Sequence, residues 1–342
     1  MPGVAVAREM QKLGWSVSWI GTEVGMEGRL VAGAGYDFDA LSFTGMRGKG
    51  LSHAVKGAFR LAASVWRGRK ILKERRAGAV FTTGGYIALP VAIAAKSCGL
   101  DVFAMNCDAQ MLLSIRLIAP LARRIFCGFE GPCASRSGAK ALVTGNPVRS
   151  EILEVPGAAD RMAGREGPLR LLVFGGSLGA RILNEAVPAA LAKFAPAQRP
   201  SVVHQCGAKH LDETRAAYDR AGVTARIVPF IEDMAGAYAA SDLVVCRSGA
   251  TSVSELAAAG MPSVLVPFVA STTSHQVGNA RFMQQAGAAV TLAQGECTPE
   301  RLHAVLSGLD RRALVKMGDS ARALARPEAA REAARAIEGA VK

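Results

Sequence analysis

A glycine-rich segment in the second half of the chain has the composition of an anion-binding loop. Residues 169–185 read LRLLVFGGSLGARILNE, so an apolar run leads into Gly175, Gly176, Ser177 and Gly179 and then into a helical pattern. Glycines let the backbone turn sharply, and free N–H groups at a helix start attract negative charge. The segment is neither a P-loop nor a complete GxGxxG pattern, so a glycine turn without a ligand is the alternative.

A second segment combines a strand, a small-residue loop and a helix that carries a carboxylate. Residues 242–268 read DLVVCRSGATSVSELAAAGMPSVLVPF, with a loop around Gly249, a helix from Thr251 and a stop at Gly260. Glu255 lies in the first turns of that helix, where a carboxylate can accept both hydroxyls of a ribose. Its alternative role is a favourable interaction with the helix dipole.

Three shorter motifs carry groups suited to binding. Gly84, Gly85 and Tyr86 follow the apolar run AVFTT and lead into a helical pattern. Arg149 ends the motif GNPVR, where a guanidinium could hold a diphosphate bidentately or could pair with a nearby carboxylate. A further segment contains His275, Gln276 and Asn279. Its uncharged donors and acceptors suit sugar hydroxyls, although such a pair on a surface loop is a weak signal by itself.

Alternating short apolar runs and helical stretches predict an α/β fold with parallel sheets. Runs such as LRLLVF and SDLVVC are apolar on both faces, as buried parallel strands should be. Residues 151–168 are rich in Gly, Pro and charge and predict a linker between two Rossmann-like domains, at 1–150 and 169–326. The Ala-rich helical tail, 327–342, is expected to pack back on the first domain.

The start of the chain departs from a doubly wound sheet. Its first residues, PGVAVAREMQKL, have helical spacing, whereas such a sheet normally begins with a central strand whose βα turn binds phosphate. A strand and loop of roughly 10 residues are therefore expected to be missing, which would leave neighbouring strands unpaired. A misassigned start or a fragment would explain this pattern.

Composition narrows the class of protein further. The formal charge is +13, from 41 basic and 28 acidic residues, which favours a polyanionic partner or surface, with solubility charge as the alternative. Nucleic acid is disfavoured because aromatic residues make up only 6% and no stacking motif occurs. Seven scattered cysteines without CxxC spacing predict neither a zinc site nor a disulfide framework. Apolar stretches are too short for a membrane span, and no signal peptide is visible.

Taken in order, these motifs resemble one enzyme family over nearly the whole chain. The run GMRGKG at 45–50, GGY, GNPVR, GGSLGAR, FIEDM at 230–234, CRSGATSVSE and HQVGNA together resemble the MurG family, within glycosyltransferase family 28. The resemblance implies a GT-B fold, two Rossmann-like domains facing across a cleft. It also implies metal-independent, inverting transfer of GlcNAc from UDP-GlcNAc to undecaprenyl-diphosphate-linked MurNAc-pentapeptide (lipid I), with no cofactor.

The resemblance also assigns substrate groups to residues of this chain. It places uracil near Ile231, the ribose on Glu255 and the diphosphate near Ser177 with Arg149 close by. Asp108 replaces an asparagine that contacts the donor in the family, and it is the candidate general base. The predicted substrate-binding residues are Gly85, Tyr86, Asp108, Arg149, Ser177, Ile231, Ala250, Thr251, Ser252, Glu255, His275 and Gln276.

Two further departures from the family concern the first domain and the glycine loop. The family's GxGGH loop has no counterpart before Met1, and its HEQN segment reads MNCD at 105–108, with Asn106 in place of the glutamate. The glutamine of the family's GGSQGAR loop is Leu178. A catalytically silent protein that still binds UDP-GlcNAc, and a UDP-GlcNAc 2-epimerase-like enzyme, therefore stay as alternatives.

Basic and apolar residues interleave in two helical stretches of the first half. Residues 52–76 contain Phe59 and Trp66 among many Lys and Arg, and IRLIAPLARRIF at 115–126 repeats the pattern. Such helices bind anionic phospholipid through apolar insertion and charge, although packing on the sheet accounts for part of the apolar set. We therefore expect a peripheral protein at the cytoplasmic face of the inner membrane, where cell-wall synthesis proteins are possible partners.

Overall fold

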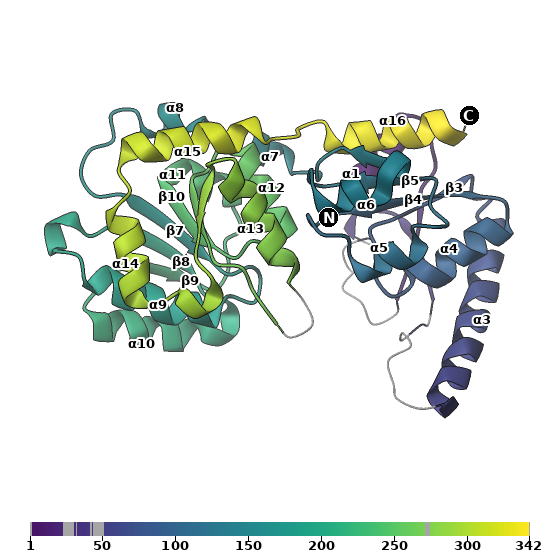
Figure 1. The fold of residues 1–342 in the computed structure, drawn as a ribbon, viewed down its shortest axis with the longest axis horizontal. Coiled ribbons are helices and arrows are strands. Elements are labelled where there is room, and N and C mark those ends of the chain that lie inside the picture. The colour runs from purple at the N-terminus through teal and green to yellow at the C-terminus, as the bar shows by residue number, and fades with distance from the viewer. Residues whose placement is uncertain are drawn as a thin grey trace. The chain divides into compact units, whose positions relative to one another are not determined.

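A computed structural model describes residues 2–22, 31, 33–41, 43, 51–270 and 274–341. The chain divides into two compact units: unit 1 comprises Met1–Pro147 with Glu328–Lys342, and unit 2 comprises Val148–Pro327. Each unit combines helices with parallel strands (Figure 1). The predicted α/β class with parallel sheets is confirmed.

Unit 2 is built on one parallel sheet with the strand order β12-β11-β10-β7-β8-β9. Fully buried apolar residues fill its central strands, which explains the apolar runs in the sequence. The order reverses between β10 and β7, and open α/β sheets bind ligands at the carboxyl ends of strands beside such a reversal. The strands are β7 (Arg170–Phe174), β8 (Ser201–Gln205), β9 (Arg226–Val228), β10 (Leu243–Cys246), β11 (Ser263–Leu265) and β12 (Ala289–Thr291).

Helices connect these strands and follow the last of them. In chain order they are α9 (Arg181–Ala192), α10 (Leu211–Ala221), α11 (Met234–Ala240), α12 (Ala250–Ala258), α13 (His275–Gln285), α14 (Pro299–Ser307) and α15 (Arg311–Ala323). Helix α9 contacts α10 and α14, whereas α12 contacts α13 and α15. Because every strand pair is parallel, the loops that precede α9, α11 and α12 all leave the sheet at the same edge.

Unit 1 contains two separate parallel sheets among its described residues. One has the order β3-β4-β5-β6, with β3 (Ala79–Thr82), β4 (Asp101–Asn106), β5 (Arg124–Cys127) and β6 (Ala141–Val143). The other pairs β1 (Ser18–Gly21) with β2 (Asp37–Ala40). The helices are α1 (Pro2–Lys12), α3 (Leu51–Glu74), α4 (Ala88–Ser97), α5 (Leu113–Ile118), α6 (Pro132–Ser137) and α16 (Ala329–Val341).

Helix α1 packs against both sheets of unit 1. Val6 and Met10 join a core cluster with Phe103 and Phe126 of the larger sheet, whereas Ala7 packs with Tyr36 beside the smaller one. The C-terminal helix α16 contributes to the first of these clusters and contacts α1. A helix thus links two sheets that no described strand joins.

The segment predicted as a linker is instead an integral part of unit 2. Residues 151–168 contain most of α7 (Ser150–Leu153) and all of α8 (Ala158–Met162), and α8 contacts α15. Ile152 and Ala158 are buried, so the segment contributes to the core despite its weak periodicity. The boundary between the units falls at Pro147, before the predicted end of the first domain.

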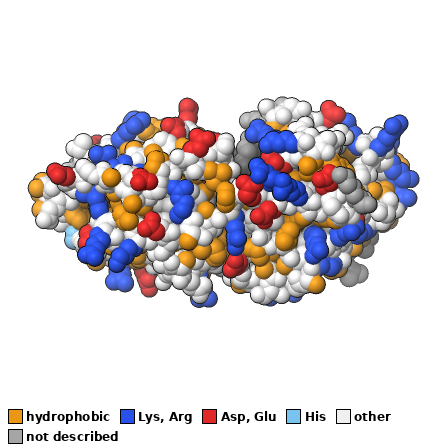
Figure 2. All heavy atoms as spheres, turned by 90° about the horizontal axis from the view of Figure 1, so that it is seen from above, with side chains coloured by type: hydrophobic (Ala, Val, Ile, Leu, Met, Phe, Trp, Pro, Cys, Tyr) orange, Lys and Arg blue, Asp and Glu red, His pale blue; other side chains and the backbone are white. Residues whose placement is uncertain are grey.

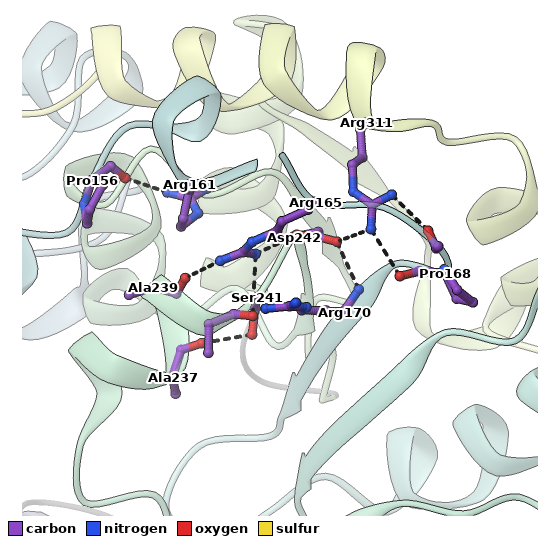
Figure 3. Close-up of polar contacts among 12 residues, drawn as sticks. Pro156, Arg161, Arg165, Pro168, Arg170, Ala237, Ala239, Ser241, Asp242 and Arg311 are labelled. Carbon is purple, nitrogen blue, oxygen red and sulfur yellow. Dashed lines mark hydrogen bonds and ion pairs between the residues drawn. The ribbon is translucent and has the colours of Figure 1, made fainter. Parts of the chain in front are cut away.

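Buried and partly buried arginines hold this segment against the rest of unit 2 (Figure 3). Arg161 donates to the carbonyl oxygens of Pro156, Ala259 and Gly260, at 2.7, 3.0 and 3.0 Å. Arg165 pairs with the fully buried Asp242 at 2.6 Å, and Arg311 pairs with the same carboxylate at 3.1 Å. These partners lie 77 and 69 positions from Asp242 in sequence, so no local pattern could have revealed them.

Candidate functional site

The glycine loop after β7 packs tightly on the loop that follows β8. Gly179 has φ +76, and a Cβ added there would collide with the carbonyl oxygen of Cys206. A Cβ on Gly207 would likewise collide with the backbone of Leu178. Only glycine fits these positions. The loop after β8 therefore fixes the backbone of the glycine loop, while Ser177 and Leu178 stay exposed to solvent.

Helix α12 begins beside this loop and carries Glu255, the residue that the sequence predicts to bind the ribose. Gly249 caps the helix, so the N–H groups of Ala250, Thr251 and Ser252 belong to its first turn. Glu255 is 7% exposed and lies one turn further along. A helix N-terminus and a carboxylate therefore share the carboxyl edge of the sheet in unit 2, as the sequence predicts.

The carboxylate of Glu255 has two partners. Nε and Nη2 of Arg149 donate to Oε1 at 3.1 and 3.0 Å, and the hydroxyl of Tyr238 donates to Oε2 at 3.4 Å. Burial raises the pKa of Glu255 above its ordinary value, and the charge and hydrogen bonds of Arg149 and the hydrogen bond of Tyr238 oppose that rise. Arg149 thus contacts Glu255, the residue predicted to bind the ribose, and its Nη1 also lies 3.8 Å from Glu151.

A hydrogen-bond network holds the start of α13 against the loop after β10. Ser248 Oγ donates to the carbonyl oxygen of Gln276 at 2.8 Å, and Asn279 Nδ2 donates to the carbonyl oxygen of Ser248 at 3.0 Å. Gln276 Oε1 accepts from the N–H of Phe268 at 2.9 Å. The predicted sugar-binding pair, His275 and Gln276, is therefore fixed next to the start of α12.

Ile231 lies in the loop after β9, before the helix α11 that Asp233 caps by accepting from the N–H of Gly236 at 2.8 Å. A hollow of about 750 Å³ beside α11 is lined by Ile231 and by parts of β7, β8 and β9. Neither Ser177 nor Glu255 lines it. Of the predicted site residues, only Ile231 lines this hollow, so we locate the glycine loop and Glu255 at the sheet edge outside it.

The candidates of unit 1 lie at the ends of two adjacent strands. Gly85 and Tyr86 follow β3, and Asp108 follows β4, which pairs with β3 in parallel. Gly84 and Gly85 both have φ +94, which explains the two consecutive glycines. Tyr86 is exposed.

Asn106, which replaces the family's glutamate, shapes the loop that carries Asp108. It is fully buried, its Nδ2 donates to the carbonyl oxygens of Asp108 and Gln110, and its Oδ1 accepts from the N–H of Leu112 at 2.8 Å. Burial raises the pKa of the neighbouring Cys107 thiol to about 12, so this thiol stays protonated at neutral pH. Among the described residues, no group of three or more His, Cys, Asp or Glu side chains could hold a metal ion.

Comparison with known proteins assigns the chain to a family. Residues 1–127 match the glycosyltransferase family 28 N-terminal domain, and residues 170–337 match its C-terminal domain. A protein of Methylibium petroleiphilum is 50% identical over 100% of this chain and 94% of its own length. The chain belongs to glycosyltransferase family 28. That relative is named UDP-N-acetylglucosamine–N-acetylmuramyl-(pentapeptide) pyrophosphoryl-undecaprenol N-acetylglucosamine transferase, as is a Janthinobacterium protein that is 48% identical over 100% of this chain and 95% of its own.

Solved structures support the same family and the GT-B fold. The crystal structure of Acinetobacter baumannii MurG matches with a TM-score of 0.85 at 32% identity, over 99% of this chain and 95% of that one. A UDP-GlcNAc 2-epimerase of Neisseria meningitidis matches with a TM-score of 0.66 at 14% identity, over 98% and 95% of the two chains. The second likeness shows only the shared fold, so the family 28 assignment rests on the closer matches.

Two residues around the site were missed by the sequence analysis. Tyr238 lies in the Ala-rich helix α11 and is fully buried, and Gln205 ends the apolar strand β8 with its side chain buried. Each is a polar side chain in an otherwise apolar run, which is the signal that could have found them. Neither belongs to a motif, because their partners are distant in sequence.

Proposed function

We propose that this family 28 protein transfers GlcNAc from UDP-GlcNAc to undecaprenyl-diphospho-MurNAc-pentapeptide and so forms lipid II for peptidoglycan. One observation carries the proposal. A glycine loop, the N-terminus of α12 and the buried carboxylate of Glu255 meet at the carboxyl edge of one parallel sheet. The relatives named for this reaction match nearly the whole chain at 47–50% identity.

The donor is proposed to bind along this edge. Uracil lies near Ile231, and the ribose hydroxyls donate to Glu255, which is the usual acceptor type for a ribose. The diphosphate lies over Ser177 and the first turn of α12, at Ala250, Thr251 and Ser252 (residues 250–252), where free N–H groups and the helix dipole favour negative charge. His275 and Gln276 receive the sugar hydroxyls, and Arg149 contributes positive charge beside the diphosphate.

The proposed reaction is a single displacement. The C4 hydroxyl oxygen of the acceptor attacks C1 of GlcNAc while the bond from C1 to the UDP oxygen breaks, which inverts the anomeric centre. The hydroxyl proton passes to Asp108, and the departing UDP takes the bonding electrons. The N–H groups of the glycine loop and of α12 stabilise that developing charge because they point at a fixed position before the reaction begins. Gly85 and Tyr86 contact substrate next to Asp108.

Transfer of labelled GlcNAc from UDP-GlcNAc to a lipid I analogue tests the proposal. Glu255→Ala should abolish measurable UDP-GlcNAc binding, whereas Glu300→Gln, which changes an exposed carboxylate of α14, should leave transfer unchanged. Asp108→Asn should lower kcat by about 10²-fold or more if Asp108 is the base, with little change in KM. Donor binding without transfer would favour a silent binder, and conversion of UDP-GlcNAc to its 2-epimer would favour epimerase chemistry.

We also propose that unit 1 holds the protein at the cytoplasmic surface of the inner membrane. Phe59 and Trp66 of α3 are 74% and 69% exposed, and Leu113 and Leu117 of α5 are also exposed. Both helices belong to unit 1 and contact α4. Exposed Arg60, Arg67 and Arg116 accompany them, which suits anionic headgroups.

Two further observations concern how the protein would meet a membrane. In the part of the chain that the structure describes, no helix is both long and apolar enough to cross a bilayer. On the face in Figure 2, Lys and Arg side chains are interspersed with Asp and Glu, so net charge alone does not define a binding surface there. The exposed apolar side chains of α3 and α5 are therefore the groups proposed to enter the membrane surface.

Vesicle sedimentation tests the membrane proposal. The protein should bind phosphatidylglycerol vesicles more strongly than phosphatidylcholine vesicles, and Phe59→Ser with Trp66→Ser should weaken binding about tenfold or more, since both side chains lose their insertion energy. Leu142→Ser removes a partly exposed apolar side chain of β6 and serves as the matched control. Equal binding by the double variant and the control would refute the assignment.

A further inference from the structure

Gln205 connects three strand ends at the candidate site. It is the last residue of β8, and its backbone pairs with Phe174 of β7 on one side and Val228 of β9 on the other. Its side chain is 4% exposed. Oε1 accepts from the N–H of Gly175 at 3.3 Å, and Nε2 donates to the carbonyl oxygen of Pro229 at 3.1 Å. One amide therefore joins the backbones that leave β7 and β9.

Gly175 and Pro229, the two residues bonded to this amide, begin two loops of the proposed donor site. One loop is proposed to bind the diphosphate and the other the uracil. Gly175 starts the glycine loop that carries Ser177, and Pro229 directly precedes Phe230 and Ile231. A primary amide suits this place because it offers a donor and an acceptor on one rigid plane without charge. The amide thus fixes the spacing between a phosphate-binding loop and a base-binding loop.

A second contact makes the glycine loop depend on the turn that follows Gln205. Gly179 lies against the carbonyl oxygen of Cys206, closer than any Cβ would allow. Asn184 of α9 donates to that same carbonyl oxygen at 3.1 Å. Asn184 Oδ1 in turn lies 3.1 Å from Nε2 of the fully buried His204. The turn after Gln205 is therefore held in place by the buried residues Asn184 and His204.

We infer that Gln205 is a positioning residue that couples the diphosphate and uracil subsites, and this inference rests on the proposed function. A ligand that spans both subsites gains affinity only when their spacing is set in advance, because otherwise binding has to order both loops. A ligand that fills one subsite gains nothing from the coupling. Loss of the amide should therefore weaken UDP more than it weakens uridine.

The ratio of the dissociation constants of uridine and UDP, measured on the full chain, tests this inference. Gln205→Met keeps the length of the side chain and removes both hydrogen bonds, so the ratio should fall about tenfold while uridine affinity changes by less than about threefold. KM for UDP-GlcNAc should rise by a similar factor, with kcat nearly unchanged. Ser241→Ala, which removes a buried hydroxyl bonded to the carbonyl oxygen of Ala237 at 2.7 Å, should leave the ratio unchanged.

A second variant gives a signature that a merely structural role would not produce. In Gln205→Glu, an ionised carboxylate can still accept from the N–H of Gly175, but it cannot donate to the carbonyl oxygen of Pro229. The protonated acid can do both, so KM of this variant should approach the wild-type value as pH falls, relative to wild type at each pH. The inference would be overturned if Gln205→Met left the ratio of the uridine and UDP dissociation constants unchanged, or if KM of Gln205→Glu did not recover at low pH. Either result would leave the proposed function intact. Absence of UDP binding in the wild-type chain would overturn the proposed function and this inference with it.

Discussion

The ion pair between Arg149 and Glu255 leads to a prediction that depends on pH. Arg149→Met removes the guanidinium and its two hydrogen bonds but keeps most of the side-chain length. Removal of one partner from a buried pair costs about 3–5 kcal/mol, whereas exposed pairs contribute about 0.2–1 kcal/mol. The side chains of Arg149 and Glu255 are 42% and 9% exposed, so solvent screens the pair partly. We expect a loss of about 1.5 kcal/mol in the stability of unit 2 near pH 8.

The sign of the pH dependence follows from the pKa of Glu255. Burial raises this pKa in the folded protein, so stability falls as pH rises from the unfolded value through the raised folded value. In the wild type, the positive charge of Arg149 lowers the pKa of Glu255 and so opposes the effect of burial. Arg149→Met removes that charge, so the pKa of Glu255 rises further and the pH range over which stability is lost extends to higher pH. The difference between the variant and the wild type should therefore shrink as pH falls toward and below the ordinary pKa of a glutamate, because Glu255 then becomes protonated in both proteins.

Urea denaturation with two optical probes measures this effect. All three tryptophans, Trp15, Trp19 and Trp66, lie in unit 1, so their fluorescence reports that unit, whereas far-ultraviolet circular dichroism also reports unit 2. Arg149→Met should change only the dichroism transition, and the double variant Arg149→Met/Glu255→Gln should lose the added pH dependence. Arg181→Met breaks an exposed pair and should leave the dichroism transition unchanged at any pH. Equal losses near pH 5 and pH 8, or no relief in the double variant, would refute the reasoning.

Three further predictions concern the same unit. Tyr238→Phe removes the hydroxyl that lies 3.4 Å from Glu255 Oε2, so calorimetry should show discrimination between UDP and 2′-deoxy-UDP reduced by about threefold; undiminished discrimination would contradict it. Asp242→Ala leaves two partly buried guanidinium groups without their carboxylate and should cost about 3–5 kcal/mol in urea denaturation, and a loss below about 1 kcal/mol would argue against it. Gly179→Ala forces a Cβ onto the Cys206 carbonyl oxygen, so UDP affinity should fall about tenfold or more while the tryptophan transition stays in place.

Local features of the sequence predicted much of the fold and of the donor edge. The run at residues 169–174 was expected as a buried strand, and β7 spans Arg170–Phe174. The glycines at 175, 176 and 179 were expected to form a turn, and two of them have positive φ. Such features can be read from a sequence because periodicity and backbone conformation depend on neighbouring residues.

Contacts between distant residues account for what was not predicted. Residues 151–168 looked like a linker because their partners, Asp242 and the carbonyl groups near Gly260, lie elsewhere in the chain. The motif around Arg149 allows a diphosphate or a nearby carboxylate as its partner, but it cannot reveal the contact with Glu255, which lies 106 positions away. Gln205 belongs to no motif, although its amide joins two loops of the site.

The way the glycine loop is held in place explains how Leu178 can replace a glutamine at its tip. Leu178, which stands where the family has glutamine, is 79% exposed, so its side chain does not hold the loop. The loop is instead fixed from below, by Gly179 against Cys206, by Gly207 against the backbone of Leu178 and by the amide of Gln205. Because backbone N–H groups do the proposed phosphate binding, a change of side chain at the tip alters contacts to the sugar or acceptor without disturbing the anion site.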